Sequence, residues 1–257
     1  MNGLILAAGE GKRLRPHTLD KPKSLVELAD KSLLGRQIDV LRSCGVKNVV
    51  CVGGYRSEML RDYCDTLICN DDYRDTNMVW SFLLASKHLM SDTLISYGDI
   101  VYSPRLVTKI QESAGDIVVP VDVNWRKYWA SRTTNIIDDV ETLKVSSQGL
   151  ITEIGGRPTS LDEIEGQYMG LIKTTQVGLR QLKDLCNRAL SGQLSLRRPL
   201  RESYLTDLLQ GAIDCSVEVR AHFTKEPWVE IDTVQDLLAP VSSARVRLID
   251  QLLEAKN

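Results

Sequence analysis

The sequence lacks several features that mark common classes of protein. Its 257 residues carry no surplus of basic side chains, since 32 Lys and Arg stand against 34 Asp and Glu. That balance argues against a nucleic acid or an anionic membrane as a partner. No apolar run approaches the roughly 20 residues of a membrane-spanning helix. The N-terminal apolar stretch is short and its charges come after it, unlike a signal peptide, so we expect a cytoplasmic protein.

Cysteine and histidine are too scattered to predict a structural zinc site. None of the six cysteines forms a CxxC pair, and the three histidines are far apart. Cys51 and Cys69 fall in apolar, strand-like runs, where we predict reduced thiols of the core. The sequence also lacks a hexapeptide array, which excludes a left-handed β-helix.

What remains is an ordinary globular composition, with 43% hydrophobic and 26% charged residues. Five short runs rich in Val, Ile and Leu are predicted strands: 4–7, 49–52, 66–69, 93–96 and 117–121. Helices are predicted from Ser32 to Gly45, from Asn77, and from Pro104. This alternation of strands and helices predicts an α/β fold with a Rossmann-like, doubly wound mixed sheet.

The second half of the chain is less regular. We expect residues 122–175 to form a smaller β-rich insertion, followed by a helix over 176–189. A final amphipathic helix is expected over 241–257, after Pro240. The predicted organisation is one domain over residues 1–240, with the insertion on its acceptor side, and a C-terminal helix.

The most informative segment is LILAAGEGKRLRPHTLDKPKSL, near the N-terminus. A strand is predicted to end at Ala7, and small residues follow it, which let backbone N–H groups approach an anion closely. It is not a Walker A loop, because Arg13 follows Gly11 and Lys12 where that motif needs Ser or Thr. It is not a dinucleotide fingerprint either, because Leu14 replaces the third glycine. A GxG pair alone is equally compatible with a solvated cationic turn.

The whole segment resembles the signature of the nucleotidyltransferase (pyrophosphorylase) family. The matching positions are Leu6, Gly9, Gly11, Arg13, Pro16, Thr18, Pro22 and Lys23. Lys12 departs from the pattern, since sugar-nucleotide members usually have Thr or Ser there. The resemblance implies the nucleotidyltransferase fold, catalytic roles for Arg13 on the leaving pyrophosphate and Lys23 on the α-phosphate, and a loop that cradles a nucleoside triphosphate. The loop residues implied in nucleotide binding are Leu6, Ala7, Ala8, Gly9, Gly11 and Lys12.

Two aspartates are candidates for binding Mg²⁺, the usual partner of phosphates in this chemistry. Asp99 follows a predicted strand, and Gly98 before it completes a pair that resembles the family's metal position. Asp232 lies in WVEIDTVQDL, which resembles the family's late E-x-D segment. An aspartate at a strand end is more often a helix cap or a loop residue, so either one alone is a weak signal, and Asp232 is well placed to cap a helix over 233–238.

The nucleotide is suggested by a narrower resemblance. Gly54 and Tyr55 follow the second strand, where the base is expected, and Asn77 opens a helix that can also face the nucleotide. These segments resemble the cytidylyltransferase branch, which activates phosphocholine, phosphonates or glutamine. The resemblance implies CTP as the substrate. A sugar-1-phosphate uridylyl- or thymidylyltransferase, and a nucleotide-binding regulator without turnover, remain alternatives.

The small-molecule acceptor is expected at the insertion. Trp125, Tyr128 and Trp129 share one face if their segment is helical, and such a face can cage a quaternary ammonium group. Arg132 can instead bind a phosphate, phosphonate or carboxylate. The tryptophans are equally compatible with packing of the insertion or with a subunit interface, which leaves a homodimer open. Further acceptor candidates, from family-like segments, are Glu141, Tyr168 and Glu230.

Overall fold

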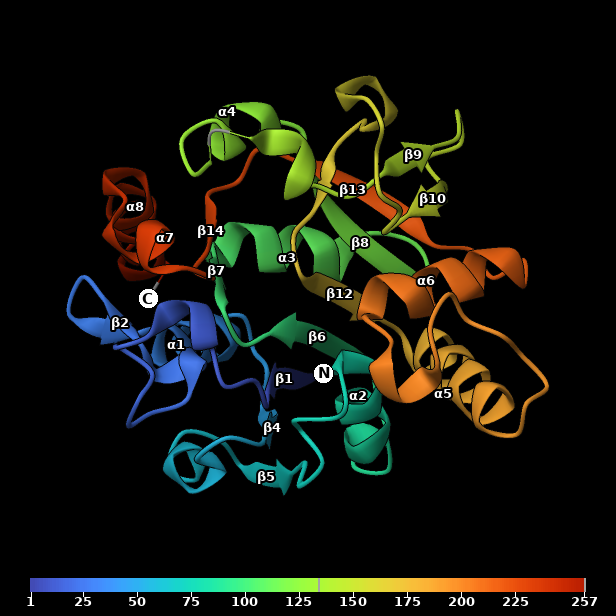
Figure 1. The fold of residues 1–257 in the computed structure, drawn as a ribbon, viewed down its shortest axis with the longest axis horizontal. Helices are drawn as coiled ribbons and strands as arrows, with labels where there is room; N and C mark the ends of the chain where they lie inside the picture. The colour runs from blue at the N-terminus through green and yellow to red at the C-terminus, as the bar shows by residue number, and fades with distance from the viewer. Residues whose placement is uncertain (134, 257) are drawn as a thin grey trace. The chain divides into compact units, whose positions relative to one another are not determined.

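The computed structural model describes residues 1–133 and 135–256, and it divides into two compact units. The first unit contains residues 1–74, 94–112 and the chain from 226 onward; the second contains residues 75–93 and 113–225. The chain therefore leaves the first unit twice and returns to it twice. As a consequence, the first unit is built from three stretches that are far apart in the sequence (Figure 1).

The sheet of the first unit has its N-terminal strand in the middle. Strand β1 (Asn2–Ala7) pairs in parallel with β4 (Asn48–Gly53), and β4 pairs in parallel with β5 (Thr66–Cys69). Strand β6 (Thr93–Tyr97) lies on the other side of β1, so the order is β6-β1-β4-β5. These four strands confirm the strands predicted from the apolar runs at 4–7, 49–52, 66–69 and 93–96. Cys51 is buried as expected, whereas Cys69 is exposed because it ends the last strand in this order.

Helices and short strands complete the first unit. Helix α1 (Leu33–Ser43) begins where the Ser32 hydroxyl accepts a 3.1 Å hydrogen bond from the Gly35 amide. Two short antiparallel pairs are present, β2 (Glu27–Leu28) with β3 (Lys31–Ser32), and β7 (Ile100–Tyr102) with β14 (Trp228–Glu230). The other α-helices among the described residues of this unit are α3 (Pro104–Glu112), α7 (Val234–Leu238) and α8 (Pro240–Glu254).

The second unit has strands of mixed direction around β8 (Ile117–Asp122). Strand β8 pairs antiparallel with β11 (Gln167–Tyr168) and β12 (Leu171–Thr174), and parallel with β13 (Arg220–Thr224). A separate hairpin joins β9 (Leu143–Val145) to β10 (Ile151–Ile154). The helices are α2 (Met78–Ser86), α4 (Trp125–Trp129), α5 (Gln176–Leu190) and α6 (Leu205–Asp214). Parallel and antiparallel pairs together confirm the predicted mixed α/β class.

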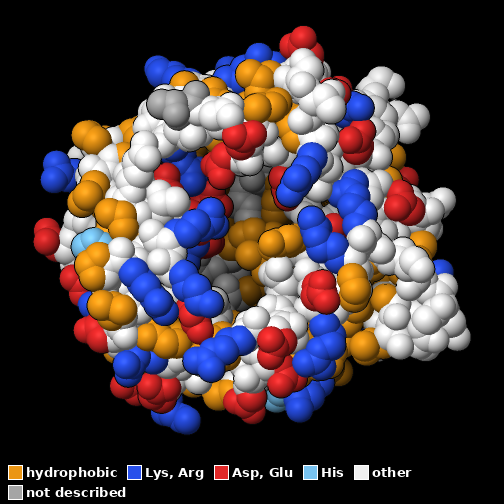
Figure 2. Space-filling view, viewed as in Figure 1, with side chains coloured by type: hydrophobic (Ala, Val, Ile, Leu, Met, Phe, Trp, Pro, Cys, Tyr) orange, Lys and Arg blue, Asp and Glu red, His pale blue; other side chains and the backbone are white. Residues whose placement is uncertain are grey.

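The surface agrees with the balanced composition. Figure 2 shows basic and acidic side chains interleaved over the visible face, without one sign dominating it. Within the described part of the chain, no helix has both the length and the apolar character that crossing a membrane requires.

Candidate active site

The ends of three neighbouring strands bring the predicted nucleotide-binding residues together. The Gly98 amide, just after β6, donates a 2.9 Å hydrogen bond to the Leu6 carbonyl in β1. The Tyr55 amide, just after β4, donates a 3.1 Å hydrogen bond to the Ala8 carbonyl. The carboxyl ends of parallel strands are where α/β proteins bind ligands. The structure thus gathers Leu6, Ala7, Ala8, Gly54, Tyr55 and Gly98 at one such edge.

Two of these positions need glycine because backbones approach closely there. A Cβ at Gly98 would lie 2.9 Å from the Leu6 carbonyl oxygen, and one at Gly54 would lie 2.6 Å from the Ala8 carbonyl oxygen. Both distances are shorter than normal contacts to a methyl group. The two glycines therefore allow the neighbouring strand ends to close around the end of β1.

The glycine-rich loop uses its two glycines differently. Gly11 has a left-handed backbone with φ +61°, and its carbonyl accepts a 2.9 Å hydrogen bond from the Thr18 hydroxyl. A Cβ there would lie 2.8 Å from the Cβ of Lys23, so Gly11 lets Lys23 pack against the loop. A Cβ at Gly9 would meet no described atom within 4 Å. The fold therefore explains Gly11 but does not explain Gly9.

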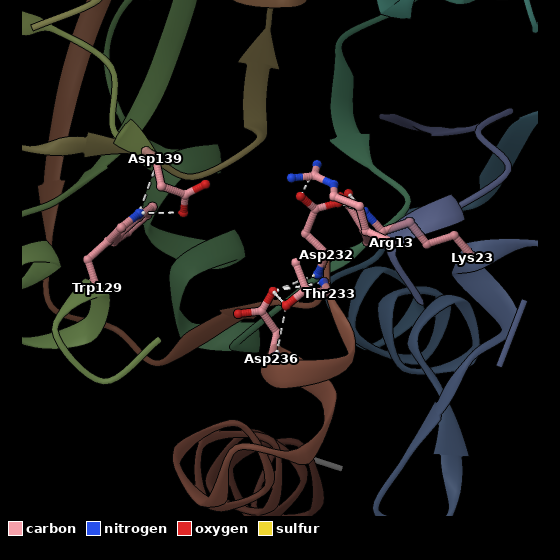
Figure 3. Close-up of polar contacts among 8 residues, drawn as sticks. Arg13, Lys23, Trp129, Asp139, Asp232, Thr233 and Asp236 are labelled. Atoms are coloured by element: carbon pink, nitrogen blue, oxygen red, sulfur yellow. Dashed lines mark hydrogen bonds and ion pairs between the residues drawn. The ribbon is translucent and has the colours of Figure 1, made fainter. Parts of the chain in front are cut away.

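Four predicted residues meet in one ion-pair cluster. The Lys23 Nζ lies 2.6 Å from Asp99 Oδ2 and 2.5 Å from Asp232 Oδ1. Arg13 is paired with the other oxygen of Asp232, and Figure 3 shows Arg13 and Lys23 converging on that carboxylate. The 2.9 Å hydrogen bond from the Ile231 amide to the Asp99 carbonyl holds the two aspartate segments side by side. Three distant stretches of the chain thus contribute to this cluster.

The side chains of Lys23, Asp99 and Asp232 are mostly buried, whereas that of Arg13 is 66% exposed. Burial alone would lower the pKa of Lys23, but the charges of Asp99 and Asp232, and their hydrogen bonds, outweigh it and raise that pKa above its usual value. Lys23 is therefore a cation throughout the neutral range. Oδ1 of Asp99 is buried and accepts no hydrogen bond from any described residue. Carboxylate oxygens of this kind, one of them unpaired, fit a hard divalent cation such as Mg²⁺.

The structure shows that Asp232 is not the residue that caps helix α7. The cap of α7 is Thr233, whose hydroxyl accepts a 3.1 Å hydrogen bond from the Asp236 amide. Asp236 in turn accepts hydrogen bonds from the amides of Thr233 and Asp232, at 2.9 and 3.1 Å (Figure 3). The Asp232 carboxylate is left for Lys23 and Arg13. Asp236 was not among the residues predicted from the sequence, although its position three residues after Thr233 is a capping-box signal.

The remaining nucleotide candidates have local partners. The Asn77 side chain caps α2 by accepting a 2.9 Å hydrogen bond from the Met78 amide. The Tyr55 hydroxyl donates a 2.7 Å hydrogen bond to the Leu19 carbonyl, at the far end of the glycine-rich segment. Lys12 is exposed, and its Nζ lies 3.4 Å from a carboxylate oxygen of Glu10. Nucleotide-binding roles for these three residues stay predictions.

The aromatic acceptor candidates form a closed cluster in the second unit. Helix α4 buries Trp125, Tyr128 and Trp129 to 3% exposure or less. Arg132 is also buried, at 5% exposure, and its guanidinium carbon lies 5.1 Å from the ring centres of both Tyr128 and Trp129. The indole nitrogen of Trp129 donates a 3.1 Å hydrogen bond to Asp139 (Figure 3). The predicted helical face exists, but an arginine of the chain already covers it.

The other acceptor candidates, Glu141, Tyr168 and Glu230, are held by main-chain contacts or strand pairing within their own units. Glu141 is linked to β11 through its main chain, since its carbonyl accepts a 2.8 Å hydrogen bond from the side-chain amide of Gln167. Tyr168 follows in the same strand and pairs with Val121 of β8. Glu230 ends β14 and pairs with Ile100 of β7 in the first unit. Roles for Glu141, Tyr168 and Glu230 in acceptor binding stay predictions.

A glycine-rich loop at the carboxyl edge of a mixed sheet, with cations and paired carboxylates beside it, defines the class of nucleotide-binding α/β proteins. Within that class, the chain belongs to the family of MobA-like NTP transferase domains, whose model matches residues 3–164. This membership confirms the resemblance to nucleotidyltransferases.

Relatives and solved structures agree with this assignment. CTP:phosphoglutamine cytidylyltransferase of Campylobacter jejuni is 34% identical over 248 residues, which cover 92% of this chain and 98% of the relative. The inositol-1-phosphate CTP transferase from T. maritima has a TM-score of 0.73 at 20% identity, covering 99% of this chain and 95% of that one. CTP:phosphocholine cytidylyltransferase from Streptococcus pneumoniae has a TM-score of 0.71 at 20% identity, covering 98% of both chains. The two structures support the nucleotidyltransferase fold.

Proposed function

We propose that the protein is a cytidylyltransferase that transfers CMP from CTP to a small phosphate-bearing acceptor and releases pyrophosphate, with Mg²⁺ as the metal. The observation that carries the proposal is the cluster in which Lys23 bridges Asp99 and Asp232 while Arg13 pairs with the same aspartate. It combines cations for phosphate oxygens with carboxylates for a divalent ion, at the strand edge where α/β proteins bind ligands. The relative named for CTP, matched along nearly its whole length, supports CTP as the nucleotide.

In the proposed reaction, an oxygen of the acceptor attacks the α-phosphorus of CTP. A new P–O bond forms to the acceptor, and the bond to the bridging oxygen of the β-phosphate breaks in line with it. The electron pair leaves with pyrophosphate. An acceptor phosphate is already ionised at neutral pH, so this chain needs no general base.

The chain's own residues position and neutralise the phosphates. Lys23, held in its charged form, is placed to exchange its aspartate partners for oxygens of the α-phosphate. Arg13 carries a planar, bidentate donor group suited to the departing pyrophosphate. Gly9 and Gly11 leave the loop backbone open to an anion. Asp99 and Asp232 would hold Mg²⁺, which when bound neutralises phosphate charge.

The aromatic cluster favours an anionic acceptor over a choline-like one. Recognition of a quaternary ammonium requires aromatic faces open to the ligand. In this chain Tyr128 and Trp129 are buried, and the Arg132 guanidinium lies over both rings. We therefore propose an acceptor of the phosphoglutamine type, and we assign the two tryptophans to packing of α4. A triphosphate substrate also suits the cytoplasmic location that the sequence suggested.

The nucleotide is tested by thermal unfolding with Mg²⁺ and each of CTP, UTP, dTTP, ATP and GTP. A ligand that binds only the folded protein raises the unfolding midpoint, so CTP should give the largest rise. Asp99→Asn and Asp232→Asn should abolish the response, whereas the control Asp39→Asn, on the exposed side of α1, should keep it. Preference for UTP or dTTP would instead support a sugar-1-phosphate enzyme. The acceptor is tested by comparing pyrophosphate release with phosphoglutamine and with phosphocholine.

A further inference from the structure

A second charge cluster lies in the glycine-rich loop and has Glu10 at its centre. One carboxylate oxygen of Glu10 accepts a 3.1 Å hydrogen bond from the Arg74 Nε. The other oxygen lies 3.4 Å from the Lys12 Nζ and 3.6 Å from an Arg15 guanidinium nitrogen. One acidic side chain, placed between the two loop glycines, therefore faces three cations.

Exposure within this cluster is uneven. The Glu10 side chain is 11% exposed, whereas the side chains of Lys12 and Arg74 are each 70% exposed. In an ordinary surface ion pair both partners are open to water. Here the carboxylate is shielded, whereas Lys12 and Arg74 keep most of their surface free for another anion, and the Arg15 side chain is 49% exposed. The hydrogen bond from Arg74, with help from Lys12, lowers the pKa of Glu10, so the carboxylate is ionised at neutral pH.

Arg74 is fixed to the same sheet edge as the loop. Its guanidinium lies 5.4 Å from the ring centre of Tyr73. The Cβ of Tyr73 in turn packs so closely on Gly54 that a side chain at Gly54 would lie 2.5 Å from it. Arg74 thus reaches Glu10 from the turn after β5 and adds a cation that the glycine-rich segment itself does not supply.

We propose that Arg74 is a further polyphosphate-binding residue, and that Glu10 is a built-in counter-ion which holds Arg74, Lys12 and Arg15 at the loop until a polyphosphate competes for them. The inference rests on the proposed function and deepens it. Glu10 is a positioning residue in this account. It keeps the cations ordered, and its negative charge weakens binding of the triphosphate and favours release of pyrophosphate.

Removal of the Glu10 charge should strengthen binding of a polyphosphate. Glu10→Gln keeps the size of the side chain but removes its negative charge. At about 4 Å from a bound anion, and at the dielectric constant of water, the loss of that repulsion corresponds to about fivefold tighter pyrophosphate binding. Arg74→Gln should weaken the binding about tenfold, because a charge-assisted contact is lost. If Glu10 only held the loop in shape, Glu10→Gln would loosen the cations and weaken binding instead.

The test is calorimetric titration of the full chain with pyrophosphate in the presence of Mg²⁺. Matched controls are Glu254→Gln, at the exposed end of α8, and Arg105→Gln, exposed on α3, and both should bind like the wild type. Steady-state rates add a second readout: Glu10→Gln should lower the KM for the nucleotide and increase inhibition by pyrophosphate, without raising kcat. Weaker or unchanged pyrophosphate binding by Glu10→Gln, or unchanged binding by Arg74→Gln, would overturn the inference.

The failure of this inference is distinguishable from failure of the proposed function. If the wild type binds CTP and pyrophosphate but Glu10→Gln shows no gain, the counter-ion role is wrong and the cytidylyltransferase proposal stands. If the two variants change pyrophosphate binding as expected but the wild type prefers another nucleotide to CTP, the polyphosphate inference stands and the proposed nucleotide is wrong. If the wild type binds neither any nucleotide nor pyrophosphate, both are overturned.

Discussion

At the scale of single residues, some glycines of the site are required by the fold and another is not. Gly54 and Gly98 are required by neighbouring backbone, since a Cβ at either would lie within 3 Å of a carbonyl oxygen. Gly9 has open space around it and no left-handed backbone. A glycine that the fold does not require, next to a cluster of cations, points to close approach by a ligand.

We predict that Gly9→Ala leaves the folded protein intact but impairs nucleotide binding. The free energy of unfolding should change by no more than about 0.5 kcal/mol, because the new methyl group meets no described atom within 4 Å. The KM for the nucleotide should rise about tenfold or more, because the methyl group would stand between the loop and the phosphates. Urea unfolding and steady-state rates measure the two effects. Normal kinetics with normal stability would show that the phosphates do not approach Gly9.

Lys23 carries the second prediction at this scale. Lys23→Met removes the cation between two mostly buried carboxylates, so stability without metal should fall by about 1–3 kcal/mol. Turnover should fall about a hundredfold or more, because a positioned charge on the reacting phosphate is lost. Added Mg²⁺ should raise the thermal midpoint of the variant more than that of the wild type, since Lys23 no longer competes for Asp99 and Asp232. Equal responses to Mg²⁺ would contradict a shared site.

At the scale of helices and strands, local pattern predicts the elements well. The apolar runs locate β1, β4, β5, β6 and β8, and the Ser32 cap locates α1. Contacts between segments far apart in the chain are much harder to predict from the sequence. The Glu10–Arg74 pair spans 64 residues and has no sequence pattern, and only the fold brings its partners together. The roles of Lys23, Asp99 and Asp232 were suggested by family resemblance, because spacing alone leaves each as an ordinary loop residue.

Strand β5 illustrates a contact of this kind. Asp65, just before the strand, accepts 2.6 Å hydrogen bonds from the Val49 amide and from Arg42, and its own amide donates to the Val49 carbonyl at 2.9 Å. The hydrogen bond from Val49, followed by that from Arg42, lowers the pKa of Asp65 although burial opposes the change. The ionised carboxylate therefore fastens the start of β5 to β4.

We predict that Asp65→Asn destabilises the protein at pH 7 by about 0.5–1 kcal/mol, a small value because both partners are partly exposed. The folded carboxyl has a lower pKa than the unfolded one, so its contribution is fully present above about pH 5 and declines as the pH falls through the folded pKa. The difference between wild type and variant should shrink accordingly in urea unfolding between pH 7 and the acid limit of the fold. A difference that stays constant or grows, or an equal effect from the exposed neighbour Asp62→Asn, would contradict this.

At the scale of the whole molecule, the candidate site depends on chain topology. The chain returns to the first unit at residue 94 and again at residue 226, and these returns supply Asp99 and Asp232 to the segment that follows β1 and contains Lys23. Such a site cannot form from any one segment. Family membership confirms the nucleotidyltransferase class, while the local pattern of the chain could not have indicated which distant carboxylates meet Lys23.

The most direct test of the central proposal is the initial rate of pyrophosphate release from CTP with phosphoglutamine and Mg²⁺. The account predicts release with CTP that depends on both the acceptor and the metal, at least tenfold slower release with UTP or dTTP, and loss of the rate in Asp99→Asn and Lys23→Met. A rate that favours UTP or dTTP, or that is unaffected by those two substitutions, would contradict the assignment of the cluster as a cytidylyltransferase site.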